Sequence, residues 1–284
     1  MKKKIAIAIA ALGSAVVTPA AMASDGCSGL PSYSDLKTAL HNATFANTQD
    51  VTKPGGNGGF NLHMWGTVVN RDGVVCAVAF TGGDRGDQWP GSRVISAQKA
   101  NTANAFSLPG LALATANLYT AVQPGGSLYG LQHSNPVDTA AAYAGPSSAY
   151  GTRYDPLVNQ KSGGVNVFGG GLALYNSAGK LIGAIGVSGD SSCADHNVAW
   201  RARNNLGLDH VPPVGNIISG DSARPDNIVY DITNGVSAGG WGHPVCSEAA
   251  KAFAASPVGS TYSYNAGTAT SHFDITAPAL PATR

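Results

Sequence analysis

A short turn, Asn70-Arg71-Asp72-Gly73, lies between two β-rich runs at 62–69 and 74–81. Glycine accepts the positive φ angle that a tight hairpin turn requires, and two strands joined by so short a loop pair with each other. The pattern therefore predicts an antiparallel hairpin. The rest of the chain must then supply the layer that covers the apolar face of a sheet.

Three more strands are predicted further along the chain, at 165–168, 172–175 and 181–187, with glycine-rich turns between them. The run 181–187 is almost wholly apolar, which is typical of a central strand. Ser34 and Ser192 are the expected N-caps of two helices, predicted at 33–46 and 194–205 respectively. Together the elements predict an α+β sandwich of one antiparallel sheet with helices on it. The helices are predicted at 33–46, 92–106 and 194–205, with a looser one at 111–122 and a short one at 248–255.

The segment 124–164 is rich in glycine, proline, serine, tyrosine and asparagine and shows little periodicity. A loop of this length in a compact domain usually covers a site or packs as a lid. After Val211, two prolines end the preceding helix, and most of the remainder is turn-forming. We therefore expect one domain at 24–211 and a loop-rich C-terminal extension at 212–284 that packs on it.

The N-terminus has the composition of a secretory signal. Three lysines at 2–4 precede an apolar run at 5–17, and Ala21-Met22-Ala23 offers the small residues that signal peptidase accepts. Residues 1–23 are therefore predicted to be removed on export to the periplasm or the extracellular space. The apolar run is too short for a bilayer core of about 30 Å, and no later segment resembles a membrane span.

Composition and charge exclude two further classes. Hydrophobic residues make up 43% of the chain and charged residues only 12%, so this is a chain with a core and not a disordered polyelectrolyte. Loss of the three signal lysines changes the formal net charge from +1 to −2 (+1 − 3). The mature protein then has no basic excess for a phosphate backbone, and nucleic acid is not an expected partner.

All four cysteines, Cys27, Cys76, Cys193 and Cys246, follow the predicted signal. An oxidising compartment and an even cysteine count favour disulfides, with Cys193 paired to Cys246 and Cys27 to Cys76, although the sequence does not fix the pairing. The alternative is a zinc site, because Cys193-x-x-His196 and His243-x-x-Cys246 together supply the two thiolates and two imidazoles that suit tetrahedral zinc.

Four blocks of sequence, taken in order, resemble the GlcG/HbpS-like haem-binding family, also called the haem-degrading domain family. They are SRVISAQKANTA at 92–103, PGGSLYGL at 124–131, FGGGLAL at 168–174 and GAIGVSG at 183–189. The resemblance covers roughly residues 34–207. It implies a five-stranded antiparallel sheet flanked by helices, a profilin/PAS-like sandwich. It also implies frequent homo-oligomerisation and the binding of haem or a related tetrapyrrole as a small-molecule ligand.

Haem binding needs an apolar slot, an axial donor for iron and hydrogen-bond donors for the propionates. His133 is the first candidate for the axial and metal-binding residue, because a histidine in a loop beside glycine can approach a planar ligand. His196, whose ring Asp195 could orient, is the second candidate, although a helix-capping role explains both residues. His63, on a predicted strand, is the third, and the alternative there is a packed side chain.

The resemblance places Lys99 and Thr102 on helix positions that tend to face the family's cleft. Lys99 could neutralise a propionate or another carboxylate, and the alternative is an exposed helix lysine. Gly170, in the third block, completes the candidate ligand set. Ser96-x-x-Lys99 also matches the serine-lysine pattern of penicillin-interacting enzymes, but the accompanying Ser-Asp-Asn and Lys-Thr-Gly elements are absent.

Two functions from different classes follow. The first is an exported protein that binds haem or another flat aromatic ligand. The second is a cofactor-independent enzyme that acts on a small organic acid in the same cleft, with Lys99, Asp195 or His196 in the acid–base role. A structural or interaction domain is the third possibility. Glutamate chemistry is not expected, since Glu248 is the sole glutamate of the sequence.

Overall fold

The computed structural model describes residues 26–45, 54–212 and 217–255. Four strands form one antiparallel sheet in the order β2-β1-β4-β3. The predicted hairpin is confirmed, because β1 and β2 pair directly on either side of the Asp-Gly turn. The strands are β1 (Trp65–Asn70), β2 (Val75–Phe80), β3 (Gly171–Tyr175) and β4 (Leu181–Ser188).

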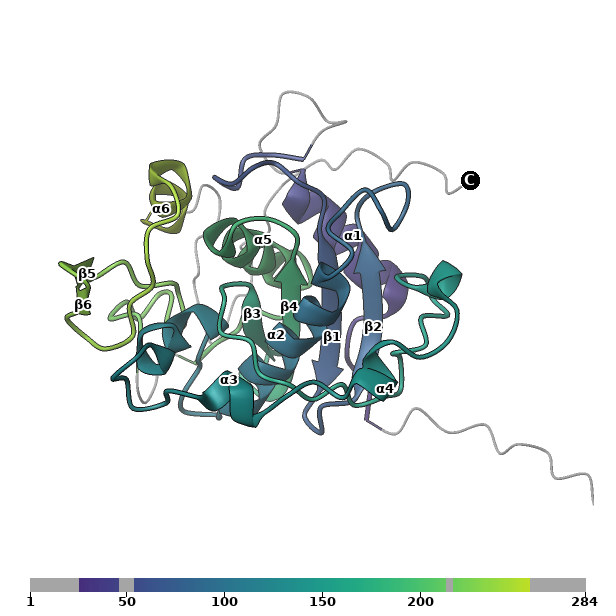
Figure 1. The fold of residues 1–284 in the computed structure, drawn as a ribbon, viewed down its shortest axis with the longest axis horizontal. Helices are drawn as coiled ribbons and strands as arrows, with labels where there is room; N and C mark the ends of the chain where they lie inside the picture. The colour runs from purple at the N-terminus through teal and green to yellow at the C-terminus, as the bar shows by residue number, and fades with distance from the viewer. Residues whose placement is uncertain (1–25, 46–53, 213–216, 256–284) are drawn as a thin grey trace, which may run out of the picture.

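Helices cover both faces of the sheet (Figure 1). One helix, α2, packs on one face against β1, β3 and β4, whereas α1 and α5 pack together on the other face. The result is a three-layer sandwich with the sheet in the middle. The helices are α1 (Tyr33–Thr44), α2 (Ser92–Phe106), α3 (Leu131–Ser134), α4 (Thr139–Ala142), α5 (Ser192–Asn205) and α6 (Glu248–Ala255).

Side chains alternate between two hydrophobic clusters along the strands. In β4, Ile185 joins the cluster under α1 and α5, and its neighbour Ala184 joins the cluster under α2. In β1, Val68 and Val69 divide in the same way. Both faces are therefore buried, which explains why the sequence of β4 is almost wholly apolar. Full burial of one side chain such as Ile185 contributes about 1.5–3 kcal/mol.

Gly186 allows α2 to approach the sheet closely. A Cβ atom at this position would lie 2.0 Å from the Ser96 carbonyl oxygen and 2.5 Å from the Ala100 nitrogen. Any side chain here would push the helix away from β4. Gly186 thus serves helix packing, whereas a Cβ atom at Gly183 would meet the Val69 carbonyl oxygen of the neighbouring strand β1 at 2.2 Å.

The sheet has four strands and not the five that the resemblance implied. The run 165–168, predicted as a strand, has no regular secondary structure and joins no ladder in the described structure. Side chains take the hydrogen bonds that a neighbouring strand would have taken, because the Asn166 N–H donates to Thr102 Oγ1 and the Val167 N–H to Gln132 Oε1. A separate two-stranded sheet, β5 (Ile232–Thr233) with β6 (Val236–Ser237), lies in the C-terminal part.

Other local predictions differ in detail. Ser32, and not Ser34, caps α1, and it forms a capping box with Asp35. Ser191, and not Ser192, caps α5. The looser helix predicted at 111–122 is two short 3-10 turns, η1 (Thr115–Leu118) and η2 (Thr120–Val122).

The predicted loop 124–164 contains α3 and α4 but no long element. In the C-terminal extension, α6 has the bounds that the sequence predicted, and it packs against α5. The predicted signal at 1–23 lies outside the described residues. Within the described ranges, no helix combines the length and the hydropathy that a membrane crossing requires.

Candidate functional site

The first cluster of predicted site residues is formed by Lys99 on α2 and Asp195 in the first turn of α5. Lys99 Nζ is 2.7 Å from Asp195 Oδ2 and also donates a hydrogen bond to the Val187 carbonyl oxygen at 3.0 Å. Asp195 uses its other oxygen to accept the Asp190 N–H at 2.8 Å. Lys99 is 1% exposed and Asp195 2%. The pair is therefore a buried salt bridge that joins the helices on opposite faces of the sheet.

Burial sets the electrostatics of this pair. Loss of water raises the pKa of Asp195 to about 6, against the opposing effect of the Lys99 ammonium. Burial likewise lowers the pKa of Lys99, and Asp195 opposes that change. Because an unpaired charge at this depth is costly, each partner needs the other. In this structure Lys99 faces Asp195, and not an open cleft where a ligand carboxylate could reach it.

Gly170 lies directly over the salt bridge. Its φ angle is +116°, and a Cβ atom there would be 2.3 Å from the Val187 carbonyl oxygen and 3.2 Å from Lys99 Nζ. Glycine is required both by the backbone conformation and by the close approach. The structure thus brings together Lys99, Asp195 and Gly170, three residues that the sequence assigned to one site.

His196 is buried beside this cluster, 1% exposed. Its Nε2 atom accepts the Ile228 N–H at 3.2 Å, so the ring holds the C-terminal extension against α5. Burial lowers the pKa of His196 to about 3, which keeps the ring neutral at ordinary pH. Asp195 contacts Lys99 and the Asp190 backbone, so it does not orient the His196 ring as the sequence suggested.

Thr102 connects α2 to the segment 165–168. Its Oγ1 atom donates to the Gln98 carbonyl oxygen and accepts the Asn166 N–H at 2.9 Å. The same segment holds α3, because the Val167 N–H donates to Gln132 Oε1 and the Val165 N–H to the Asn135 carbonyl oxygen. Gln132 was missed by the sequence analysis, although it stands next to His133.

His133 lies on α3 and is exposed to solvent. Two leucines close to it in sequence, Leu128 and Leu131, are half-buried against the cluster formed by Leu118, Val122, Val165 and Val167. Two aromatic side chains nearby are exposed. Tyr129 lies just before α3, and Phe168 ends the segment 165–168 that holds α3. His133 is thus apart from the buried Lys99 cluster, but it stands on a framework that Thr102 fixes.

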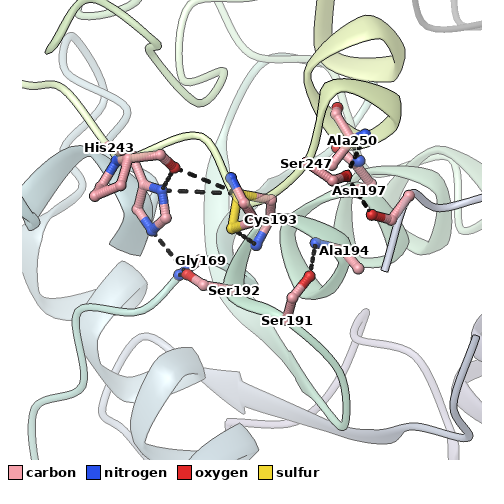
Figure 2. The surroundings of a disulfide bond; sticks show 12 residues. Gly169, Ser191, Ser192, Cys193, Ala194, Asn197, His243, Ser247 and Ala250 are labelled. Carbon is pink, nitrogen blue, oxygen red and sulfur yellow. Dashed lines mark hydrogen bonds between the residues drawn. A yellow bond between two sulfur atoms is a disulfide. The ribbon is translucent and has the colours of Figure 1, made fainter. Parts of the chain in front are cut away.

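A second cluster surrounds Cys193, at the start of α5 (Figure 2). Cys193 forms a disulfide with Cys246, and His243 Nδ1 lies 3.8 Å from Cys193 Sγ. His243 Nε2 is 2.8 Å from Ser192 Oγ, which also accepts the Gly169 N–H. Burial lowers the pKa of His243. The sequence analysis proposed no partner role for Ser192 here, since its contact with His243 spans segments far apart in the chain.

Both disulfides favoured by the sequence, Cys27–Cys76 and Cys193–Cys246, are present. The four-ligand zinc alternative is therefore wrong for this oxidised form. The sulfurs of Cys193 and Cys246 are joined in a disulfide, and His196 accepts the Ile228 N–H instead of facing them. The donor atoms of Cys193, Cys246 and His243 nevertheless lie within 4.8 Å of one another.

The family model described as "Haem degrading protein HbpS-like" matches residues 61–204. The chain belongs to the HbpS-like family. The matched range contains β1 to β4 and all but the last residue of α5. It therefore includes the whole four-stranded sheet together with Lys99, Thr102, His133, Gly170, Asp195 and His196. His243 and Cys246 lie outside it. The resemblance found from the four sequence blocks is confirmed.

Two solved structures of low similarity accompany the HbpS-like match. One is the crystal structure of the Klebsiella pneumoniae protein ORFY, labelled with the family DUF336, at 22% identity and a TM-score of 0.40, covering 61% of this chain and 86% of that chain. The other is a PduOC:haem complex, at 26% identity and a TM-score of 0.40, covering 62% of this chain and 94% of that chain. No curated protein gives a significant match.

Proposed function

We propose that this protein binds haem or a closely related tetrapyrrole at the surface around α3, with His133 as the axial ligand of the iron. The observation that carries the proposal is the exposure of the His133 imidazole on a segment fixed to the core, within the range matched by the HbpS-like family. Imidazole is a common axial ligand of haem iron.

The residues around His133 fit a flat apolar ligand. Leu128 and Leu131 are half-buried and present partly exposed apolar side chains, and the exposed aromatic ring of Phe168 follows Val167, which Gln132 contacts. These side chains would cover the ligand face, while His133 would supply the nitrogen donor. Bound haem would supply an iron centre for ligand binding or electron transfer.

The buried candidates fit that ligand less well. The ammonium of Lys99 and the carboxylate of Asp195 are paired with each other, and His196 Nε2 already accepts a backbone N–H. We therefore assign these residues, with Gly170 and Thr102, to the framework that positions the 165–170 segment. The same burial argues against the alternative enzyme, because a small acid would have to open the core to reach Lys99, Asp195 or His196.

We also propose that the protein works outside the cytoplasm as a ligand-binding protein, and that copies of it associate. Both described disulfides suit an oxidising compartment, in keeping with the signal predicted from the sequence. The apolar side chains exposed around α3 offer surface to a second copy as well as to a ligand.

Titration with haemin tests the assignment. The wild-type protein is expected to shift and sharpen the Soret band at one haemin per chain, and His133→Ala to lose that shift. His210→Ala is the matched control, because His210 is half-buried at the far end of β3. Equal Soret spectra for wild type and His133→Ala would reject His133 as the ligand. No haemin binding by the wild type would reject the proposed function.

A further inference from the structure

The geometry at the start of α5 points to a second site, unrelated to the tetrapyrrole. We propose that Cys193–Cys246 is a reducible disulfide whose dithiol form, together with His243, binds a thiophilic metal ion such as Zn²⁺. The three donor atoms, two sulfurs and one imidazole nitrogen, already lie within 4.8 Å of one another. Two thiolates and one imidazole, with one open position, form a donor set that suits zinc.

The two sulfurs differ in accessibility. Cys246 is exposed, whereas Cys193 is fully buried, at 0%. An external thiol can therefore reach Cys246 but not Cys193. By contrast, both cysteines of the Cys27–Cys76 bond are half-buried. Access controls the rate of thiol–disulfide exchange, so an external reductant is expected to open Cys193–Cys246 first.

The surroundings of Cys193 stabilise it as the leaving sulfur. Its Sγ accepts the Cys246 N–H at 3.2 Å and lies 3.8 Å from His243 Nδ1, as Figure 2 shows for the Cys193–His243 contact. Cys193 is also the second residue of α5, where the helix N-terminus favours negative charge. We therefore expect the reductant to attack the Cys246 sulfur, with the Cys193 sulfur as the leaving group.

The reaction balances with an external dithiol as the reductant. Its first thiolate forms a bond to Cys246 Sγ while the Cys193–Cys246 bond breaks and the electron pair stays on Cys193. The second thiol of the reductant then displaces Cys246 and closes a disulfide in the reductant, which has lost two electrons. The protein is left with two thiols, and a bound Zn²⁺ ion displaces their two protons.

The contacts around the donors resemble the outer contacts of a metal site. Each sulfur accepts the backbone N–H of the other cysteine, at 3.2 Å in both cases. In the disulfide form His243 Nδ1 lies 2.7 Å from the Pro244 carbonyl oxygen. With metal on Nδ1, the ring proton would move to Nε2 and donate to Ser192 Oγ at 2.8 Å. Such a partner orients a histidine ligand.

Little movement is required to form the site. In a tetrahedral zinc site the sulfurs stand about 3.8 Å apart, given Zn–S bonds of about 2.3 Å. The two Cα atoms are already only 5.9 Å apart. After reduction, rotation of the two side chains suffices to separate them. The bound ion would then keep α6 and its preceding segment tied to α5.

The order of reduction is the first test. The folded protein is treated anaerobically with dithiothreitol for increasing times, and free thiols are alkylated and located by mass spectrometry. Cys193 and Cys246 are expected to be labelled before Cys27 and Cys76. Labelling of all four together, or of Cys27 and Cys76 first, would overturn the proposal.

Metal binding is the second test. The reductant is removed anaerobically, and the protein is titrated with Co²⁺ alone and then with Zn²⁺ in competition. One Co²⁺ per chain with thiolate charge-transfer absorption is expected, and its displacement by Zn²⁺. Since loss of an outer partner alone weakens metal binding about 10–100-fold, His243→Ala is expected to cost at least tenfold. His210→Ala is expected to bind like the wild type.

Equal Co²⁺ affinity in the wild type and His243→Ala, or no thiolate absorption in the reduced wild type, would overturn the site. If His243→Ala does not fold, Ser192→Ala replaces it, with a weaker loss of about tenfold expected. The disulfide form of the wild type must bind no Co²⁺ at this site. Soret titration with haemin separates the two proposals, because His133 takes no part here.

Discussion

Two histidines that the sequence offered as iron ligands, His133 and His196, occupy opposite environments. His133 is exposed on the four-residue helix α3, whereas His196 is 1% exposed within α5 and accepts a backbone N–H. His196, Lys99 and Asp195 are buried, and their contacts hold the layers of the fold together. The exposed α3 region keeps its imidazole available for a ligand. The difference teaches that the same residue type acts as framework or as ligand according to its depth.

The largest effect is expected from breaking the framework at Lys99. Lys99→Met leaves the Asp195 carboxylate buried without its cation, and removal of one partner of a buried pair costs about 3–5 kcal/mol. Urea unfolding at pH 7 measures the free energy of unfolding. Lys161→Met is the matched control, because Lys161 is exposed and its loss is expected to cost under about 0.5 kcal/mol.

The double variant Lys99→Met with Asp195→Asn sharpens the result. It removes both charges, while the amide oxygen introduced by the second substitution can still accept the Asp190 N–H, so it is expected to recover at least half of the loss. A Lys99→Met variant as stable as Lys161→Met would show that the Lys99–Asp195 pair contributes nothing to stability. The distinction between a buried framework and an exposed ligand-binding region would then be wrong.

Much of this framework could be predicted from sequence, because its signals are local. The hairpin turn and the α2 bounds both reflect conditions that residues close in sequence impose. The strand at 165–168 was predicted wrongly because Thr102 and Gln132, distant in sequence, take its backbone hydrogen bonds. In the same way, the sequence named Lys99 and Asp195 but could not show that they pair with each other across 96 residues.

The second effect is a pH dependence that belongs to the buried histidine. The His196 pKa falls from 6.5 to about 3 on folding, so below pH 6.5 the unfolded chain binds a proton that the native protein does not. This contribution to stability is present above pH 6.5 and is lost as the pH falls. At pH 4.5 the loss amounts to about 3 kcal/mol. His196→Gln is expected to remove it.

Asp195 acts in the opposite sense. Burial raises its pKa to about 6, so between about pH 6 and 4 the native protein takes up a proton and gains stability. The wild-type profile is therefore flatter than His196 alone would give, and the difference between wild type and His196→Gln isolates the histidine. Urea unfolding at pH 7 and 4.5 measures both, with His210→Gln as control. Parallel profiles for wild type and His196→Gln would contradict a buried neutral ring.

The smallest change in stability, and the most informative about the link between the two regions, is expected from Thr102→Val. Valine keeps the shape of threonine but leaves the Asn166 N–H without its acceptor, which costs about 1–3 kcal/mol. Because 165–168 holds α3 through Gln132, this loss in the framework is expected to loosen His133 as well. Haemin affinity should therefore fall, although Thr102 is buried and lies on a different helix from His133.

Thr102→Ser tests whether the hydroxyl carries this effect. Serine retains the oxygen that accepts the Asn166 N–H, so it is expected to restore haemin affinity even though the lost methyl group lowers stability. Affinity that followed stability in both variants would point to general loosening of the domain. Unchanged affinity in Thr102→Val would mean that the α3 region binds its ligand independently of α2. A restored Soret shift in Thr102→Ser alone would place one hydrogen bond between the buried framework and the exposed histidine.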